Sequence, residues 1–291
     1  MALRKDRITL CWPNYIDSAA LSGGQYVETL PLSRAQDRRF SRFAKTVNTA
    51  PESTWFTANL PRPSPVSVVA IPAHNMSSTA TCRVRVYQDA QQDLLMWDSG
   101  ERQVWPAVYS GAELEWEYDN YWFGTLSEEE RNQYTPLMTV FLDAVQIAQS
   151  VRVDLSDPFN PQGFITFGRI FIADAWQPEF NMAWNPEFGF NSGTTLIEAD
   201  DDARTEYADR KTPKRTFAFT LEHMSEGEAF GKAMRMQRTQ DIFGEILFAE
   251  SLAATPQFFD KTFIGRLESL DPLQYPYLNA YSKAFAAREI L

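Results

Sequence analysis

Residues 66–89 read VSVVAIPAHNMSSTATCRVRVYQD, and this stretch decides the fold class. Residues 66–71 are a short apolar, β-branched run, which is typical of a strand covered on both faces. In residues 81–89 the side chains alternate between apolar and polar, and this period of two predicts a half-buried strand. The turn-forming residues Pro, Asn and Ser fill the connection between the two runs. The stretch therefore predicts two β-strands and their connection.

The connection contains His74, one of only two histidines in the chain. Its own segment has no nearby Asp, Glu or Cys that could complete a catalytic or metal site. The other histidine, His223, ends an expected strand just before a helix, where the helix dipole disfavours the charged imidazole. We therefore expect neither histidine to be catalytic or to bind a metal. Replacing either one is expected to change stability by about 1 kcal/mol.

The bulk composition limits the classes of protein that the chain can belong to. Its 291 residues suffice for one large β domain or two ordinary ones, and 44% hydrophobic residues can form a core. The net charge of −11 disfavours nucleic acid or an anionic membrane as the main partner. No apolar run approaches the roughly 20 residues of a membrane-spanning helix, and the N-terminus lacks a signal-peptide core. The two cysteines, Cys11 and Cys82, are expected to be buried thiols.

Strand patterns divide the chain into two parts, 1–177 and 178–291, joined by a Pro- and Gly-bearing segment at 178–194. Prolines at 61–65 predict a loop or an edge between two strands. In the first part we expect strands at 8–12, 53–60, 66–71, 80–87, 94–98, 140–157 and 163–173. In the second part we expect strands at 194–200, 214–224, 241–251 and 261–269.

One helix is predicted at 225–239. Ser225 and Glu228 have the spacing of a capping box, in which each side chain bonds the backbone amide of the other residue. The helical period places one apolar group inward, namely Phe230, Ala233, Met234 and Gln237. It places three basic residues toward water, namely Lys232, Arg235 and Arg238. The predicted fold class is thus mainly β, a jelly-roll β-sandwich followed by a second β-rich domain with one α-helix.

Residues 98–139 form a long excursion rich in aromatic residues, which in a compact domain is usually functional or interfacial. Within it, alternation of four acids with apolar residues over 113–119 predicts a strand with one buried face. The alternative is an aromatic platform that stacks on sugars or anchors a partner chain. The candidate residues for a ligand or an interface are Trp105, Trp116, Tyr118 and Trp122.

Two charged segments allow more than one interpretation. The basic segment 34–45, with Arg38, Arg39 and Arg42, is either a solvated turn or an arm that docks on an acidic neighbour. The acidic run Asp200–Asp202 lacks the spaced oxygens and the glycine of a calcium loop. We expect that run to be a turn between two strands.

Sequence motifs for catalysis are missing from the chain. It has no G-x-S-x-G, no P-loop, no H-E-x-x-H and no strand-borne G-x-G-x-x-G. Acidic residues are plentiful, so the sequence does not exclude glycoside hydrolysis by a pair of carboxylates. The leading expectation is a protein that is not an enzyme and uses neither cofactor nor metal.

Two stretches resemble a known family. Residues 53–90 and 151–178 resemble the galactose-binding-like (discoidin-type) jelly roll of structural proteins from tailed bacteriophages. The motifs that carry this resemblance are IPAHN and DPFNPQGFITFGRIFIA. Residues 214–250 look like the strand–helix–strand part that follows this jelly roll, which is similar to tail-tube domains. The order of the two domains is inverted relative to distal tail proteins.

This resemblance implies a structural component of the tail tip or baseplate, a distal-tail-like protein. Such a protein would form a ring with itself and join the tail tube to the hub or fibres. It would be part of the virion tail and would be assembled in the host cytoplasm. A carbohydrate-binding adhesin module that contacts host surface glycans is the alternative, because the jelly roll alone does not determine function.

Overall fold

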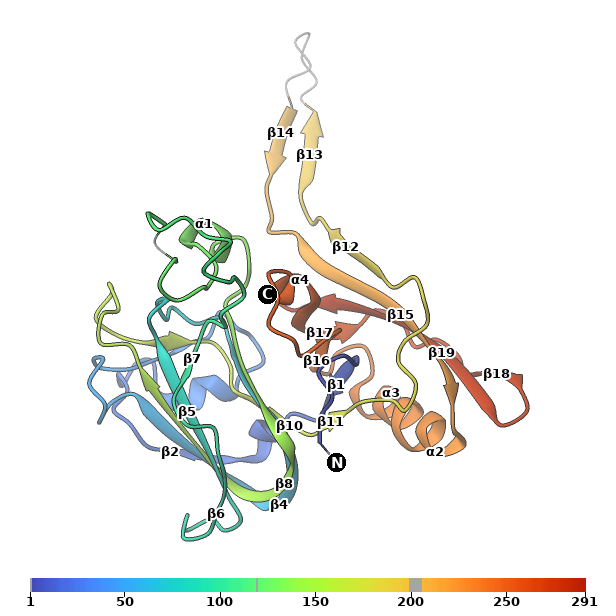
Figure 1. The fold of residues 1–291 in the computed structure, drawn as a ribbon, viewed down its shortest axis with the longest axis horizontal. Coiled ribbons are helices and arrows are strands. Elements are labelled where there is room, and N and C mark those ends of the chain that lie inside the picture. The colour runs from blue at the N-terminus through green and yellow to red at the C-terminus, as the bar shows by residue number, and fades with distance from the viewer. Residues whose placement is uncertain (1, 119, 199–205) are drawn as a thin grey trace. The chain divides into compact units, whose positions relative to one another are not determined.

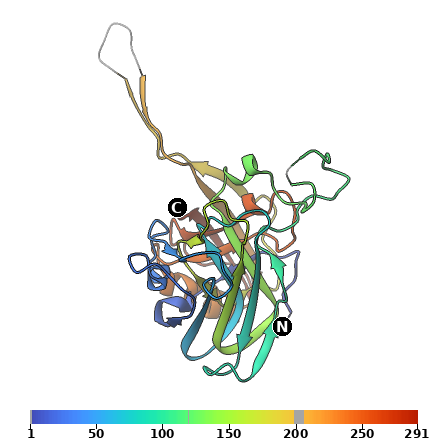
Figure 2. The same ribbon diagram turned by 90° about the vertical axis from the view of Figure 1, so that its left-hand side faces the viewer.

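The computed structural model describes all residues except Met1, Asp119 and 199–205. The chain forms two compact units (Figures 1 and 2). Unit 1 contains Met1–Gln177 and Glu245–Phe263, and unit 2 contains Pro178–Gly244 and Ile264–Leu291. One boundary between the units lies between Gln177 and Pro178. The second part is not continuous, however, because the chain returns to unit 1 for one segment.

Unit 1 is built on a seven-stranded antiparallel sheet. Its two long central strands are β4 (Trp55–Pro72) and β8 (Leu137–Ser156). Along the sheet the order is β10–β4–β8–β5–β6, with β2 on β4 and β7 on β5. These further strands are β2 (Ala20–Ser22), β5 (Thr81–Tyr87), β6 (Leu95–Asp98), β7 (Arg102–Gln103) and β10 (Phe171–Ala173).

A second, smaller layer covers the apolar face of this sheet. It consists of strands β3 (Ala44–Lys45) and β9 (Thr166–Phe167) and the 3-10 helices η1 (Tyr15–Ser18) and η2 (Leu32–Gln36). Apolar side chains from both layers share one buried cluster. The predicted mainly-β class, with a β-sandwich first, is confirmed.

The proline-rich stretch 61–65 differs from its prediction as a loop between two strands. It lies inside the single strand β4. The pairing of β4 with β8 shifts in register between Asn59 and Ser64, so the stretch forms a bulge there. Prolines fit this place because a bulge leaves backbone amides outside the ladder.

Three short strands of unit 1 pair with one another, with β1 (Thr9–Cys11) between β11 (Ala175–Trp176) and β16 (Ile246–Ala249). Residues 246–249 are all buried, which explains why the chain returns to this unit. Helix α4 (Phe258–Lys261) adds two phenylalanines to the same core as the large sheet. Cys11 and Cys82 are buried free thiols, as predicted.

Unit 2 contains an antiparallel sheet in which β19 (Ala280–Glu289) pairs with β15 (Lys214–Met224), β18 (Gln274–Tyr277) and the later part of β17 (Thr262–Leu267). Strand β12 (Glu187–Asn191) pairs with the other side of β15. A row of stacked rings crosses these strands, namely Phe188, Phe217, Phe219 and Phe285. Aromatic stacking across neighbouring strands therefore holds this sheet together.

The predicted helix of unit 2 is present, as α2 (Glu226–Glu228), the π-helical segment η3 (Ala229–Met234) and α3 (Arg235–Gln240). The capping box between Ser225 and Glu228 is confirmed. The prediction that Phe230 faces inward is wrong, because its side chain is exposed. A π turn inserts a residue into the helical period and so rotates the buried face. The buried residues are Ala229, Ala233, Met236, Gln237 and Gln240.

A two-stranded hairpin, β13 (Thr195–Glu198) with β14 (Glu206–Asp209), extends from the rest of unit 2 (Figure 1). It pairs with no other described strand. All eight of its described residues are exposed. The predicted turn at Asp200–Asp202 lies outside the described residues.

Candidate interaction surfaces

His74 is buried in unit 1, where it follows β4. Its Nδ1 accepts a hydrogen bond from the amide of Met76 (3.2 Å), and its ring lies edge-on to Trp105. Burial lowers the pKa of His74 to about 3, so the imidazole is neutral. A buried neutral ring that packs on an indole is a core residue, so its position differs from the exposed connection for which the small cost of replacement is expected. His223 is exposed at a bulge in β15.

The two motifs of the family resemblance contact each other. Asp157 is fully buried and accepts hydrogen bonds from the amide and the hydroxyl of Ser77 (2.8 and 2.6 Å). Asn160 donates to Asp157 and to the backbone oxygen of Asn75. Asn75 Oδ1 in turn accepts from the amide of Thr166 (2.7 Å). These polar residues therefore hold one connection against another, and their hydrogen-bonding groups are used within the fold.

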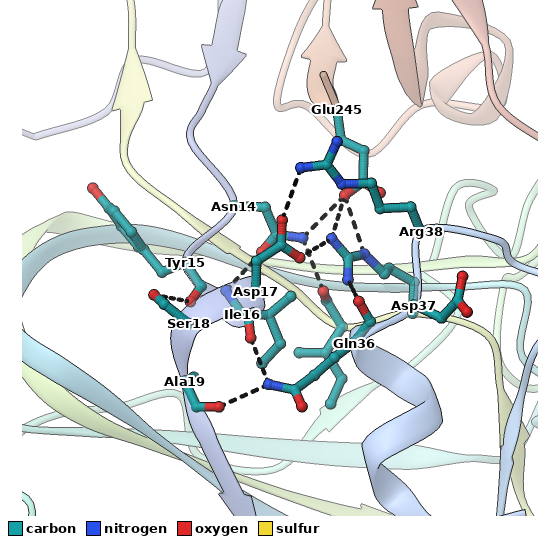
Figure 3. A network of polar contacts seen from close by, with 12 residues as sticks. Asn14, Tyr15, Ile16, Asp17, Ser18, Ala19, Gln36, Asp37, Arg38 and Glu245 are labelled. Atoms are coloured by element: carbon teal, nitrogen blue, oxygen red, sulfur yellow. Dashed lines mark hydrogen bonds and ion pairs between the residues drawn. The ribbon is translucent and has the colours of Figure 1, made fainter. Parts of the chain in front are cut away.

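One polar network of unit 1 is centred on Arg169, whose side chain is completely buried. Figure 3 labels three of its members, Asp17, Gln36 and Glu245. Nε and Nη2 of Arg169 donate to Glu245 Oε2 (3.1 and 2.9 Å). Nη2 also lies 2.5 Å from Asp17 Oδ1, and Nη1 donates to the backbone oxygen of Gln36. Asn14 adds a further hydrogen bond to Glu245 (3.1 Å). This closed network fastens the returning segment, which begins at Glu245, to the rest of unit 1.

Three of the four arginines in the basic segment, Arg38, Arg39 and Arg42, form ion pairs. Arg38 pairs with Asp17 at the edge of the network around Arg169 (Figure 3). Arg39 and Arg42 share the carboxylate of Asp37, and hydrogen bonds from Arg39 hold the pKa of Asp37 well below its usual range. Their guanidinium groups remain largely exposed, so the segment keeps a positive surface. The interpretation of this segment as a docking arm stays a prediction.

The aromatic excursion contains both core and surface residues. Trp105 is 3% exposed, packs against Phe259 and donates from its indole nitrogen to the oxygen of Met76 (3.0 Å). Trp105 therefore belongs to the core and is no longer a candidate residue for a ligand or an interface. Trp116 (70%), Tyr118 (55%) and Trp122 (79%) are exposed. These three rings form the candidate surface of unit 1.

The strand predicted for 113–119 is wrong, since the described part of this stretch consists of turns. The Glu113 carboxylate accepts from the amide and the hydroxyl of Ser110 (2.7 and 2.8 Å). The amide of Tyr118 bonds to the oxygen of Glu115 (3.1 Å). Alternation of residue types gives a strand only where another strand offers its backbone, and none does here. Asp119 lies outside the described residues.

Unit 2 is the more apolar of the two units at its surface. Among the described residues, more than half of the exposed large apolar side chains belong to it, although it holds only about a third of the chain. They include Trp184, Phe190, Leu196, Ile197, Tyr207 and Leu278. Exposed apolar surface of this extent is typical of a protein that binds another chain.

Other kinds of site find no support in the part of the chain that the structure describes. No three His, Cys, Asp or Glu side chains there are grouped so that they could hold a metal ion. Within the same residues, no helix combines the length and the apolar character needed to cross a membrane.

Comparison with known proteins gives structural neighbours only. No protein-family model matches the sequence. No curated protein matches it either. The solved structures that resemble it include the family 32 carbohydrate-binding module of C. perfringens NanJ in complex with galactose, at 14% identity and a TM-score of 0.37. That match covers 58% of this chain and 99% of the module.

A second neighbour is a His 62 mutant of the lectin binding domain of lectinolysin, complexed with Lewis b. It is 12% identical, with a TM-score of 0.35, and the match covers 56% of this chain and 96% of the domain. At such low identities and TM-scores, this likeness assigns neither a ligand nor an activity to the chain. Both neighbours bind carbohydrate, and the resemblance to phage tail proteins gains no support from them.

Proposed function

We propose that this protein is a non-catalytic assembly protein that binds further copies of itself and neighbouring structural proteins. The observation that carries the proposal is the concentration of exposed apolar side chains on unit 2, which includes both faces of the hairpin β13–β14. Such surface is costly to leave in water, and a partner chain that covers it gains the corresponding free energy.

We further infer that the assembly is a phage tail tip or baseplate, with the chain in a distal-tail-like role within the virion. Support for this comes from the two motifs of the sequence and from the presence of a β-sandwich together with a second β unit that has one helix. The inverted domain order leaves the particular neighbours of the chain unassigned.

The test is the mass of the purified full-length protein, measured by native mass spectrometry or sedimentation velocity over a range of concentrations. A closed oligomer of defined copy number is the expected result. A chain that stays monomeric at the highest soluble concentration contradicts the proposal.

Carbohydrate binding by unit 1 is the second candidate function, favoured by the exposed rings of Trp116, Tyr118 and Trp122. Flat aromatic rings of this kind can stack on the apolar faces of sugars. Quenching of tryptophan fluorescence by simple sugars, followed by a glycan array, separates the two candidates. Binding that is lost in Trp116→Ala and Trp122→Ala while the oligomer is unchanged would favour this second function.

A further inference from the structure

The hairpin β13–β14 has apolar side chains on both of its faces. Ile197 lies opposite Tyr207 on one face, and Leu196 lies opposite Ala208 on the other. All of these residues are exposed. An isolated two-stranded hairpin is only marginally stable in water. A partner that packs on it would therefore stabilise it as well as cover its apolar surface.

The same hairpin is acidic among its described residues. Glu198 and Glu206 occupy directly opposed positions of the two strands. A surface that carries cations would be the complementary partner for this end of the hairpin.

The helix of unit 2 presents such a surface. Lys232, Arg235 and Arg238 follow one another at intervals of three residues, and all three are exposed. None of them forms an ion pair with any residue that the structure describes. Arg39 and Arg42 of the basic segment differ in this respect, because they already share a carboxylate.

Apolar residues flank these cations. Phe230 precedes them in the π-helical segment η3, and its side chain is exposed. Ile242 follows the end of the helix and is also exposed. Exposed apolar side chains therefore lie near both ends of the helix that carries the three cations, as the hairpin carries apolar side chains beside its acids.

We propose that the hairpin β13–β14 of one copy docks on the basic helix face, Lys232, Arg235 and Arg238, of a second copy. The inference rests on the proposed self-assembly and names the two surfaces that make it. Both surfaces are exposed in the single chain, so neither is covered by its own copy. They are different patches, so each copy gives one hairpin and receives one, and the copies form a ring where the rotation between neighbours closes.

Two charge-reversed variants test this docking. One carries Glu198→Lys with Glu206→Lys, and the other carries Arg235→Glu with Arg238→Glu. Because each places like charges at the contact, each alone should associate at least about tenfold more weakly than the wild type. An equimolar mixture should assemble again, since each variant then offers the other an oppositely charged surface. Native mass spectrometry measures both results, and thermal unfolding checks that the variants are folded.

Matched controls separate docking from a change in net charge. Glu28→Lys with Glu52→Lys, and Lys5→Glu with Arg62→Glu, change the charge equally at exposed positions of unit 1 and should assemble as the wild type does. If the wild type, the hairpin variant and the helix variant all assemble, this inference is overturned. The proposed function then still stands. Loss of assembly in the two control variants as well would also overturn this inference. A monomeric wild type overturns the proposed function together with it.

Discussion

Arg169 shows at the scale of one residue how the fold of unit 1 depends on a buried charge. Its guanidinium contacts two carboxylates and a backbone oxygen, and it is closed off from water. Taking a guanidinium and a carboxylate such as Glu245 out of water is costly, and the cost is offset only while the partners remain together. The network is thus best understood as a structural clamp.

Replacing this arginine should be strongly destabilising. Arg169→Met leaves Glu245 buried without its cation, and we expect a loss of about 3–5 kcal/mol in the free energy of unfolding. Urea denaturation followed by circular dichroism measures it. Arg39→Met is the matched control, because its ion pair is exposed and its loss should change little. Similar midpoints for both variants would contradict the clamp.

His74 gives the protein a pH dependence of known sign. Its pKa is about 3 in the fold and 6.5 as the reference value, so the unfolded chain binds the extra proton in between. Stability is therefore full above about pH 6.5 and falls as the pH drops, by up to ~1.4 kcal/mol per pH unit. Denaturation between pH 7.5 and 5 should show this slope in the wild type. Most carboxylates titrate below this pH range, so they contribute little to the slope.

The matched variants for this slope are the two histidine substitutions. His74→Phe should remove most of the slope, and His223→Ala should leave it in place, since His223 is exposed. An unchanged slope in His74→Phe would contradict a neutral, buried imidazole. Because the side chain is buried against Trp105, we also expect His74→Ala to cost more than the ~1 kcal/mol of a typical single substitution.

At the scale of elements, the aromatic excursion 98–139 has one part that is buried in the core and another part that is exposed. Trp105 anchors it in the core, while Trp116 and Trp122 stand in solvent. The exposed rings contribute little to the stability of the fold, so their removal is informative about binding. Interfaces favour aromatic residues because they bury large areas at a low cost in side-chain entropy.

The double variant Trp116→Ala with Trp122→Ala should keep the thermal stability of the wild type. If the excursion lies at an interface, this variant should lose assembly, and if it lies at a sugar site, it should lose sugar binding. Native mass spectrometry and a glycan array provide the two measurements. Trp105→Ala is the contrasting variant, with an expected loss of about 3–5 kcal/mol typical of a buried tryptophan. A double variant that no longer folds would place these rings in the core.

At the scale of the whole molecule, unit 1 is made from two separate parts of the sequence. Residues 246–249 pair with β1, and α4 supplies Phe258 and Phe259 to the core. A fragment that ends at residue 177 therefore lacks part of its own core. A cut within 178–194 leaves residues 1–177 and 245–263 whole, so it need not unfold unit 1.

Limited proteolysis tests this arrangement. We expect the first cuts in 178–194 or in the excursion 98–135, where backbone is exposed and largely without ladder bonds. After a cut in 178–194 the two fragments should elute together from a gel-filtration column, because residues 245–263 remain packed in unit 1. Separation of the fragments under native conditions, or first cuts within 140–173, would contradict the division into units.

The sequence by itself determined the elements whose signal is local. The alternation in 81–87, the long strand at 140–157 and the capping box at Ser225 all depend on near neighbours in the chain, and each is present. The mainly-β class follows from these patterns. The exposed indoles of Trp116 and Trp122 were also marked by the aromatic composition of their segment.

Only the tertiary structure decided the features that depend on distant partners. The alternation at 113–118 formed no strand because no neighbouring strand pairs with it, and the prolines at 61–65 stayed in a strand because a bulge accommodates them. The link between Arg169 and Glu245 joins residues far apart in sequence, and so does the return of 245–263 to unit 1. Burial and pairing are properties of the packed chain, and local periodicity carries no information about which distant segment supplies the partner.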